Sequence, residues 1–320
     1  CGLKIMFGLL NINKPAGITS RKVVDLVQDA AGTGKAGHAG TLDPLATGVL
    51  VVCVGPATRL VEYIQRMRKY YRGTFVLGGS SPSDDTETDV TPLDNPPVPE
   101  VRQVTAALKQ FTGTIQQRPP EYSAVKVAGR RAYRLARQGK PVKLAAREVT
   151  VYHLDLVRYD YPQLVLDICC SGGTYVRSLG RDLAASLGTA AVMSELTRTA
   201  IGEFRLADAV ALEDLGTHNV LQHLLPASLA VAELVRLDLT ASEVQDVING
   251  RRIEREDLPV PRDELPLPHD ELPVPHGEFP VPCDGEIAAF DTSGQLLAIL
   301  SPRGKGILSP VRVFPPVAAQ

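Results

Sequence analysis

The chain has 320 residues, of which 44% are hydrophobic and 22% are charged, and its formal net charge is −2. This length predicts about two domains, and the hydrophobic share is sufficient for buried cores. No hydrophobic run reaches the roughly 18 to 20 residues of a membrane helix, and no signal peptide is visible. We therefore expect a cytoplasmic protein without a membrane segment. The five cysteines include no Cys-x-x-Cys pair, which argues against a zinc site or a disulfide framework. Met6 is a candidate for the natural start, because the chain begins at a cysteine.

The first 230 residues alternate between strand-like and helix-like patterns. In chain order we expect a strand at 9–15, a helix capped by Ser20 and stopped by Gly32, strands at 51–54 and 70–77, a polar loop at 80–99, a helix at 99–111, strands at 149–156 and 164–170, and a helix at 177–187. Val101, Val104, Leu108 and Phe111 form the expected apolar stripe of the helix at 99–111. This irregular order predicts an α+β fold with a mostly antiparallel mixed sheet.

A second, smaller unit is expected from residue 231 to residue 320. It contains a helical pattern within 238–253 that Gly250 ends, and two or three short strands within 286–314. Between them, at 256–283, lies a proline-rich heptad repeat with units such as DELPVPH. Two prolines per unit exclude a helix interior, so an extended acidic loop is predicted. A spacer, a protein-binding tract or a neutral expansion all fit this repeat.

Charge is distributed unevenly along the chain. Residues 1–230 hold 26 basic and 21 acidic residues, whereas residues 231–320 hold 8 and 15. Two segments are strongly basic: residues 118–147 have nine basic residues and one acid, and residues 59–72 have five and one. Such patches favour a polyanionic partner, although a solvated helix face is the alternative for either segment.

The segment from Gly37 to Leu50 places a single carboxylate, Asp43, between glycines and directly before a proline. A hydrophobic run follows at once, which predicts a rigid loop that leads into a buried strand. Such a loop can present one side chain at fixed geometry, as a nucleophile requires. An isolated Asp-Pro more often only caps a turn, so the neighbouring motifs must decide.

Two competing site types fit the residues poorly. Gly32-Thr33-Gly34-Lys35 lacks the Ser or Thr and the first glycine of a phosphate-binding loop. Asp84, Asp85, Glu87 and Asp89 have no known metal-loop spacing. We interpret these four acids as solvated and predict no metal site.

Six separated motifs of this chain occur together in one known family. They are Asn13 to Gly17 with Thr19-Ser20, the Asp43 loop, Lys69 to Arg72, Arg118 to Lys126, Cys170 to Arg177, and Leu196 to Arg198 with Gly202 to Phe204. In this order they closely resemble the bacterial TruB family of tRNA pseudouridine synthases, over nearly all of residues 8–215. The resemblance implies isomerisation of uridine 55 in the T-loop of tRNA to pseudouridine, after base flipping and without a cofactor. It does not decide whether Asp43 attacks the uracil ring or the ribose carbon.

The resemblance also implies roles for individual residues. Asp43 is the catalytic carboxylate, Arg177 holds it ionised through bidentate hydrogen bonds, and Tyr71 stacks on the flipped base and serves in proton transfer. His38, Tyr175 and Leu196 match substrate-pocket positions. We interpret Lys14 as a structural or site-ordering cation at the substrate-binding site. A further set matches the part that grips the T-arm: Arg130, Arg131, Arg134, Arg137, Lys140 and Lys143.

The match is incomplete at two places. Serines replace the expected threonines in the loop after Leu77, where a proline also intrudes. The unit at 231–320 resembles a PUA RNA-binding domain more weakly, through short stretches such as Ile287 to Phe290. We expect a monomer that binds tRNA and needs no obligate protein partner. The alternatives are a non-catalytic RNA-binding protein or tRNA chaperone on the same fold, and a synthase for a different RNA uridine.

Overall fold

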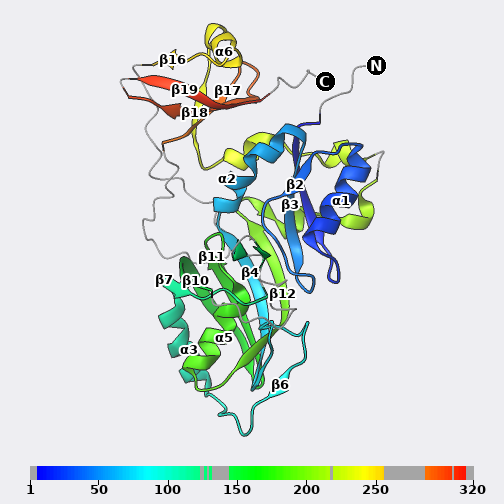
Figure 1. Ribbon diagram of the computed structural model, residues 1–320, viewed down its shortest axis with the longest axis vertical. Coiled ribbons are helices and arrows are strands. Elements are labelled where there is room, and N and C mark those ends of the chain that lie inside the picture. Colours follow the sequence, from blue (N-terminus) through cyan, green and yellow to red (C-terminus); the bar gives the residue numbers. More distant parts are fainter. Residues whose placement is uncertain are drawn as a thin grey trace.

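The computed structural model describes residues 6–122, 126–127, 130–131, 144–216, 219–255, 285–304 and 306–314. Two sheets follow one another along the long axis of the molecule, the larger one built from the first part of the chain (Figure 1). The predicted repeat at 256–283 lies outside the described residues. None of the described helices is long and apolar enough to cross a membrane.

The large sheet has ten strands in the order β14-β1-β3-β12-β4-β11-β10-β7, with β2 beside β3 and β13 beside β12. Their bounds are β1 Gly8–Lys14, β2 Ala36–His38, β3 Thr47–Val54, β4 Lys69–Leu77, β7 Gly113–Gln117, β10 Arg147–Asp160, β11 Gln163–Cys170, β12 Ala191–Ile201, β13 Phe204–Arg205 and β14 Val210–Ala211. The pairs β1–β14 and β3–β12 are parallel and the other pairs of this sheet are antiparallel. The predicted α+β class with a mostly antiparallel mixed sheet is confirmed.

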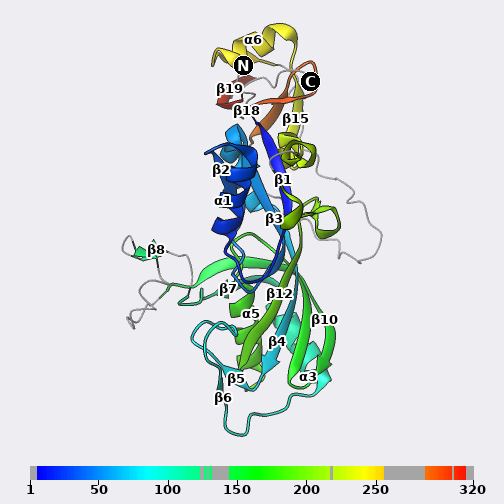
Figure 2. The ribbon, with the colours of Figure 1, turned by 90° about the vertical axis from the view of Figure 1, so that its right-hand side faces the viewer.

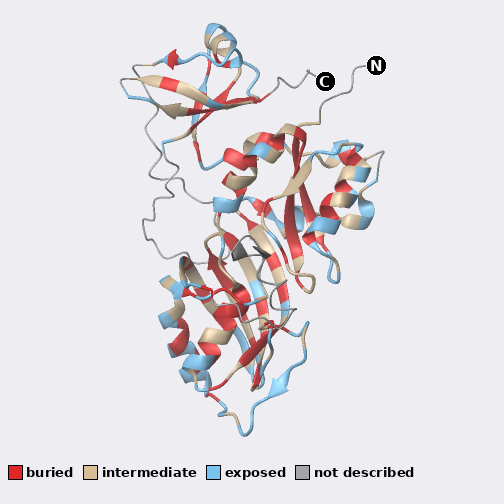
Figure 3. Cartoon of the chain, viewed as in Figure 1, coloured by how far each residue is buried: buried red, intermediate tan, exposed pale blue. Residues whose placement is uncertain are grey.

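Helices cover different parts of this sheet. Helix α1 (Ser20–Ala31) packs Val23, Val24 and Val27 against β1 and β3. Helices α3 (Val101–Leu108) and α5 (Val176–Ser186) pack on the half formed by β4, β11 and β10. Figure 3 shows the buried residues of these elements facing one another. The short helix α2 (Val61–Arg66) follows the 3-10 turn η1 (Gly55–Leu60), and further 3-10 turns are η2 Lys109–Phe111, η3 Leu206–Asp208, η4 Leu212–Asp214, η5 Val220–His223 and η6 Ala227–Val231.

Two details of the predicted helices are wrong. Thr19, not Ser20, caps α1, because its hydroxyl oxygen accepts the Lys22 N–H. The Ser20 side chain is buried and bonds to another segment instead. Val101 was expected in the buried stripe of α3 but is 56% exposed, since the helix begins at this residue and its first turn lies at the surface.

Short hairpins occur outside the two sheets. β5 (Gly79–Ser80) pairs with β6 (Thr91–Pro92) inside the segment predicted as a loop. β8 (Lys126–Val127) pairs with β9 (Arg130–Arg131), and Figure 2 shows β8 standing away from the large sheet.

The C-terminal sheet has the order β15-β17-β18-β19-β16. Its strands are β15 Val235–Asp238, β16 Ile253–Glu254, β17 Ile287–Phe290, β18 Leu296–Pro302 and β19 Ile307–Val313, and α6 Ala241–Ile248 packs on them. A capping box of Thr240 and Glu243 begins α6. The predicted small β-rich unit is confirmed. One core cluster continues from the large sheet into this unit, since it joins Leu9 and Val49 with Phe290 and Phe314.

Candidate active site

The Asp43 loop connects β2 to β3 and is tied to three other segments. The Ser20 hydroxyl accepts the Leu42 N–H at 2.8 Å and donates to the Leu42 carbonyl at 3.0 Å. Lys14 donates to the Pro44 carbonyl at 3.2 Å, and the Leu45 N–H donates to Glu87 at 3.1 Å. Backbone groups on both sides of Asp43 are therefore held by residues distant in sequence, as the predicted rigid loop requires.

Lys14 orders this loop from inside the protein. Its side chain has no exposed surface, and its ammonium also donates to the carbonyls of Pro15 and Ile18, both at 2.8 Å. Burial lowers the pKa of Lys14 to about 8, although the nearby carboxylates of Asp43 and Glu87 oppose this shift. Of the two roles predicted for Lys14, the structure supports site ordering, because the buried ammonium lies against backbone carbonyls.

Replacing Lys14 by methionine is expected to lower the free energy of unfolding by about 3 kcal/mol, because three buried carbonyls lose their donor. Asp43 then loses its fixed position, so the rate of its chemistry falls while affinity for the substrate stays. Thermal unfolding and single-turnover rates measure the two effects. Lys22→Met on the exposed face of α1 is the matched control. Unchanged stability in Lys14→Met would contradict the ordering role.

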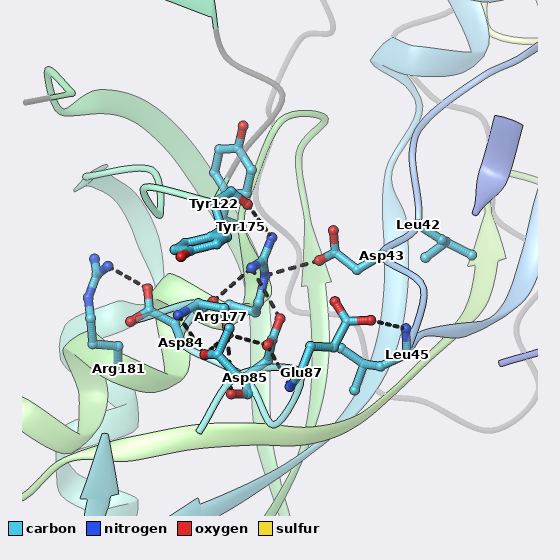
Figure 4. Close-up of polar contacts among 12 residues, drawn as sticks. Leu42, Asp43, Leu45, Asp84, Asp85, Glu87, Tyr122, Tyr175, Arg177 and Arg181 are labelled. Carbon is cyan, nitrogen blue, oxygen red and sulfur yellow. Dashed lines mark hydrogen bonds and ion pairs between the residues drawn. The ribbon is translucent and has the colours of Figure 1, made fainter. Parts of the chain in front are cut away.

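Arg177 and Asp43 meet as predicted. Arg177, the second residue of α5, is 5% exposed, and its Nε lies 3.0 Å from Asp43 Oδ2 (Figure 4). Its Nη1 lies 3.1 Å from Asp85 Oδ2 and donates to the Ser83 carbonyl at 2.7 Å. Its Nη2 donates to the Tyr122 carbonyl at 3.1 Å. The predicted bidentate pair is therefore wrong, since the guanidinium is divided between two carboxylates.

Asp85 is the main site residue that the sequence interpretation missed. It was predicted to be solvated but is fully buried, and its Oδ1 accepts the Ser83 hydroxyl at 2.5 Å and the Glu87 N–H at 3.0 Å. Asp84 is also partly buried and pairs with Arg181 at 2.7 Å. The unusual serine of this loop, Ser83, thus orients Asp85. No cluster of potential metal ligands occurs among the described residues.

Opposing influences act on the pKa of Asp43. Burial raises the pKa of Asp43 above its ordinary value, Arg177 opposes this rise, and the neighbouring Asp85 adds to it. Arg177 was expected to keep the carboxylate ionised. Its charge does act in that direction, but burial prevails. One third of the Asp43 side chain remains exposed, so a substrate can reach a carboxylate that is held by a cation and partly shielded from water.

Tyr71 lies in β4 beside a second cation. Arg198 in β12 donates to the Tyr71 hydroxyl at 3.5 Å, and its guanidinium carbon is 5.9 Å from the centre of the ring. Burial raises the pKa of Tyr71, and the Arg198 charge opposes this rise. The hydroxyl is therefore protonated at neutral pH. Arg198 belonged to a quoted motif but had no predicted role, because its partners lie in segments distant in sequence.

The three predicted pocket residues lie in different settings. Tyr175 precedes α5, its backbone exchanges two hydrogen bonds with the side chain of Gln117, and Arg147 lies 4.6 Å over its ring. Leu196 is 7% exposed and belongs to the core cluster of β4 and α5. His38 ends β2 at intermediate exposure, and burial lowers its pKa. Tyr175 and His38 thus offer surface to a ligand, whereas Leu196 offers little.

The two basic segments, 118–147 and 59–72, differ in how much of them the structure describes. Arg130 and Arg131 belong to β9, but nothing is described of their side chains, and Arg134, Arg137, Lys140 and Lys143 lie outside the described residues. In the segment at 59–72, three cations have internal partners: Arg59 donates to the Val313 carbonyl, Lys69 to carbonyls at the end of α2, and Arg72 to Asp167. Of the cations in this second segment Lys69 is buried, whereas Arg59, Arg66 and Arg72 are exposed, so the segment keeps part of its predicted basic surface.

Two family models match adjacent parts of the chain. Residues 28–176 match the model of the TruB family pseudouridylate synthase N-terminal domain, and residues 177–237 match that of the tRNA pseudouridylate synthase B C-terminal domain. The tRNA pseudouridine synthase B of Arthrobacter sp. (strain FB24) is 39% identical over 318 residues, which cover 98% of each chain. That of Thermobifida fusca (strain YX) is 43% identical over 256 residues, 77% of this chain and 86% of the relative.

Among solved structures, a Cbf5-Nop10-Gar1 complex contains a chain with a TM-score of 0.69 and 26% identity, covering 98% of this chain and 86% of that one. An H/ACA RNP bound to a substrate RNA containing 2'-deoxyuridine has the same TM-score at 24% identity, and its alignment covers 98% of this chain and 87% of that one. It shows a shared fold. The family models and the curated relatives together establish that this chain belongs to the TruB family of pseudouridylate synthases.

Proposed function

We propose that this protein isomerises uridine 55 in the T-loop of tRNA to pseudouridine. The observation that carries the proposal is the Asp43 carboxylate, which lies on an anchored loop, pairs with Arg177 at 3.0 Å and remains one third exposed. A carboxylate that is fixed in position, accessible and paired with a cation is suited to nucleophilic catalysis. The names of the curated relatives agree with this substrate.

The chemistry needs no redox partner. The bond between uracil N1 and the ribose breaks, the base turns, and a bond forms between C5 and the same ribose carbon. The proton leaves C5 and a proton is gained at N1, so atoms and electrons balance. Asp43 attacks either the ring or the ribose carbon. We assign the proton transfer to the Tyr71 hydroxyl, which stays protonated at neutral pH because burial raises its pKa.

The uridine must leave its stack before Asp43 can reach it. Tyr71 and Tyr175 offer aromatic rings to the flipped base, and His38 offers a neutral imidazole, because burial lowers its pKa. For the T-arm phosphates we propose the basic set from Arg130 to Lys143, since backbone contacts supply most nucleic-acid affinity. We further propose a catalytic domain at 1–230, a PUA-like RNA-binding domain at 231–320 and a monomeric enzyme in the cytoplasm.

The test uses an unmodified tRNA transcript and a transcript with cytidine at position 55. The expected result is one pseudouridine, mapped to position 55, in the first transcript and none in the second, without metal or nucleotide and with EDTA present. Conversion at another uridine would identify a different substrate position. Tight binding without conversion, at enzyme excess, would favour the alternative of a non-catalytic RNA-binding protein.

A further inference from the structure

Arg198 is a buried cation without a carboxylate partner. Its residue is 1% exposed, and none of the ion pairs in the described part of the chain includes it. Its guanidinium instead donates to the Val49 carbonyl at 2.7 Å, the Gly40 carbonyl at 3.0 Å and the Tyr71 hydroxyl at 3.5 Å. Keeping a charge in the interior without an opposite charge is costly, so a reason beyond packing is expected.

The three contacts of Arg198 surround the site from different directions. Gly40 lies three residues before Asp43, and Val49 lies six residues after it in β3. Tyr71 lies in β4, on the other side of β12. A single guanidinium thus joins both ends of the Asp43 loop to the Tyr71 hydroxyl.

Lys69 provides an internal comparison. It is also buried, at 5% exposure, and its ammonium donates to the carbonyls of Ile64, Gln65 and Met67 at the end of α2. All of these partners are backbone groups, and none belongs to the candidate site. Lys69 is therefore explained by helix capping. Arg198 differs because one of its donors is directed at a side chain of the site.

We propose that Arg198 is a positioning residue of the isomerisation, which holds the Tyr71 hydroxyl in fixed orientation to the Asp43 loop. A guanidinium has donors but no acceptor, so the Tyr71 oxygen accepts from Arg198. The O–H of Tyr71 is then free to point toward the flipped base. The proposal rests on the proposed function, in which Tyr71 takes part in proton transfer.

The experiment compares Arg198→Met, Arg198→Lys, Tyr71→Phe and the double variant Arg198→Met/Tyr71→Phe in single turnover with tRNA transcript. Arg198→Met is expected to slow pseudouridine formation about 10²-fold, the size of a lost proton-transfer contribution, with an unchanged dissociation constant for tRNA. Arg198→Lys should recover part of the rate. The double variant should be no slower than Tyr71→Phe, because both changes remove one interaction.

Lys69→Met is the matched control, since it removes a buried cation of purely structural role. Lys69→Met should lower the unfolding temperature, whereas the folded protein should form pseudouridine at the wild-type rate. The proposal would be overturned if the rate losses of Arg198→Met and Tyr71→Phe multiplied in the double variant. It would also be overturned if Lys69→Met and Arg198→Met lost the same amount of rate. If Arg198→Met does not fold, Arg198→Lys alone and combined with Tyr71→Phe gives the same comparison. An inactive wild-type protein would instead refute the proposed function, and this outcome requires no variant.

Discussion

Asp43→Asn is expected to lose pseudouridine formation by on the order of 10⁴-fold or more, as is typical when the central catalytic group is removed. The amide keeps the shape of the carboxylate but cannot act as the nucleophile. Affinity for tRNA should stay, because backbone contacts supply most of it. Single-turnover conversion and filter binding measure the two quantities. Asp167→Asn, which changes a carboxylate paired with Arg72 at the surface, is the matched control.

The same variant should not lose stability. Burial and Asp85 raise the pKa of Asp43 in the folded protein. The native state therefore holds its proton more tightly than the unfolded chain, and ionisation near neutral pH destabilises the fold. The amide removes this cost, while Arg177 keeps Asp85 as its partner. The unfolding temperature of Asp43→Asn should equal or exceed that of the wild type. If Asp43→Asn formed pseudouridine at close to the wild-type rate, Asp43 would not be the nucleophile.

Arg177→Met is expected to lower the stability of the protein and to change the pH dependence of pseudouridine formation. It leaves the fully buried Asp85 without its cation, which costs about 3 to 5 kcal/mol of stability. The pKa of Asp43 also rises further, because Arg177 was the main influence that lowered it. Since the ionised carboxylate is the reactive form, the rate should begin to fall at a higher pH than in the wild type as the solution is acidified.

The stability that Arg177→Met loses should depend on pH. In Arg177→Met the pKa of Asp43 in the folded state lies further above its unfolded value, so the native state binds more protons than the unfolded chain as the pH approaches neutrality. The loss of stability should therefore be largest near neutral pH and shrink as the pH falls toward the unfolded pKa of about 3.9. Urea unfolding at several pH values measures it. Arg181→Met is the control, because Arg181 lies on the same helix and pairs with Asp84. Equal losses in the two variants would contradict a special role of Arg177.

Local patterns in the sequence predicted most elements of the large sheet and its helices. Period-two alternation located β4 and β11, and glycine stops located the ends of α1 and α5, where Gly32 and Gly188 have positive φ. These features depend on neighbouring residues, so they can be read along the chain. The boundaries differed by a few residues where tertiary contacts took over, as at Ser20, whose hydroxyl binds Leu42 rather than its own helix.

The site was predicted in part. The motifs identified Asp43, Arg177 and Tyr71, and the structure brings Asp43 and Arg177 into contact. The acidic loop was misjudged because composition alone does not show burial: Asp85 has polar neighbours in sequence but lies in the interior against Arg177. Lys69 was misjudged for the same reason, since its ammonium is buried against backbone carbonyls at the end of α2.

The sequence by itself determined the family and the α+β class, because these depend on residue types at fixed spacing, and it singled out Asp43 as the proposed reacting carboxylate. The tertiary structure decided how charges are shared around that carboxylate. Arg177 is divided between Asp43 and Asp85 because the fold brings α5 against two separate loops. Arg198 reaches Gly40 and Tyr71 because the large sheet places β12 between β3 and β4. Burial and partner distance set the energy of a charge, and both arise here from contacts between segments that are far apart in the sequence.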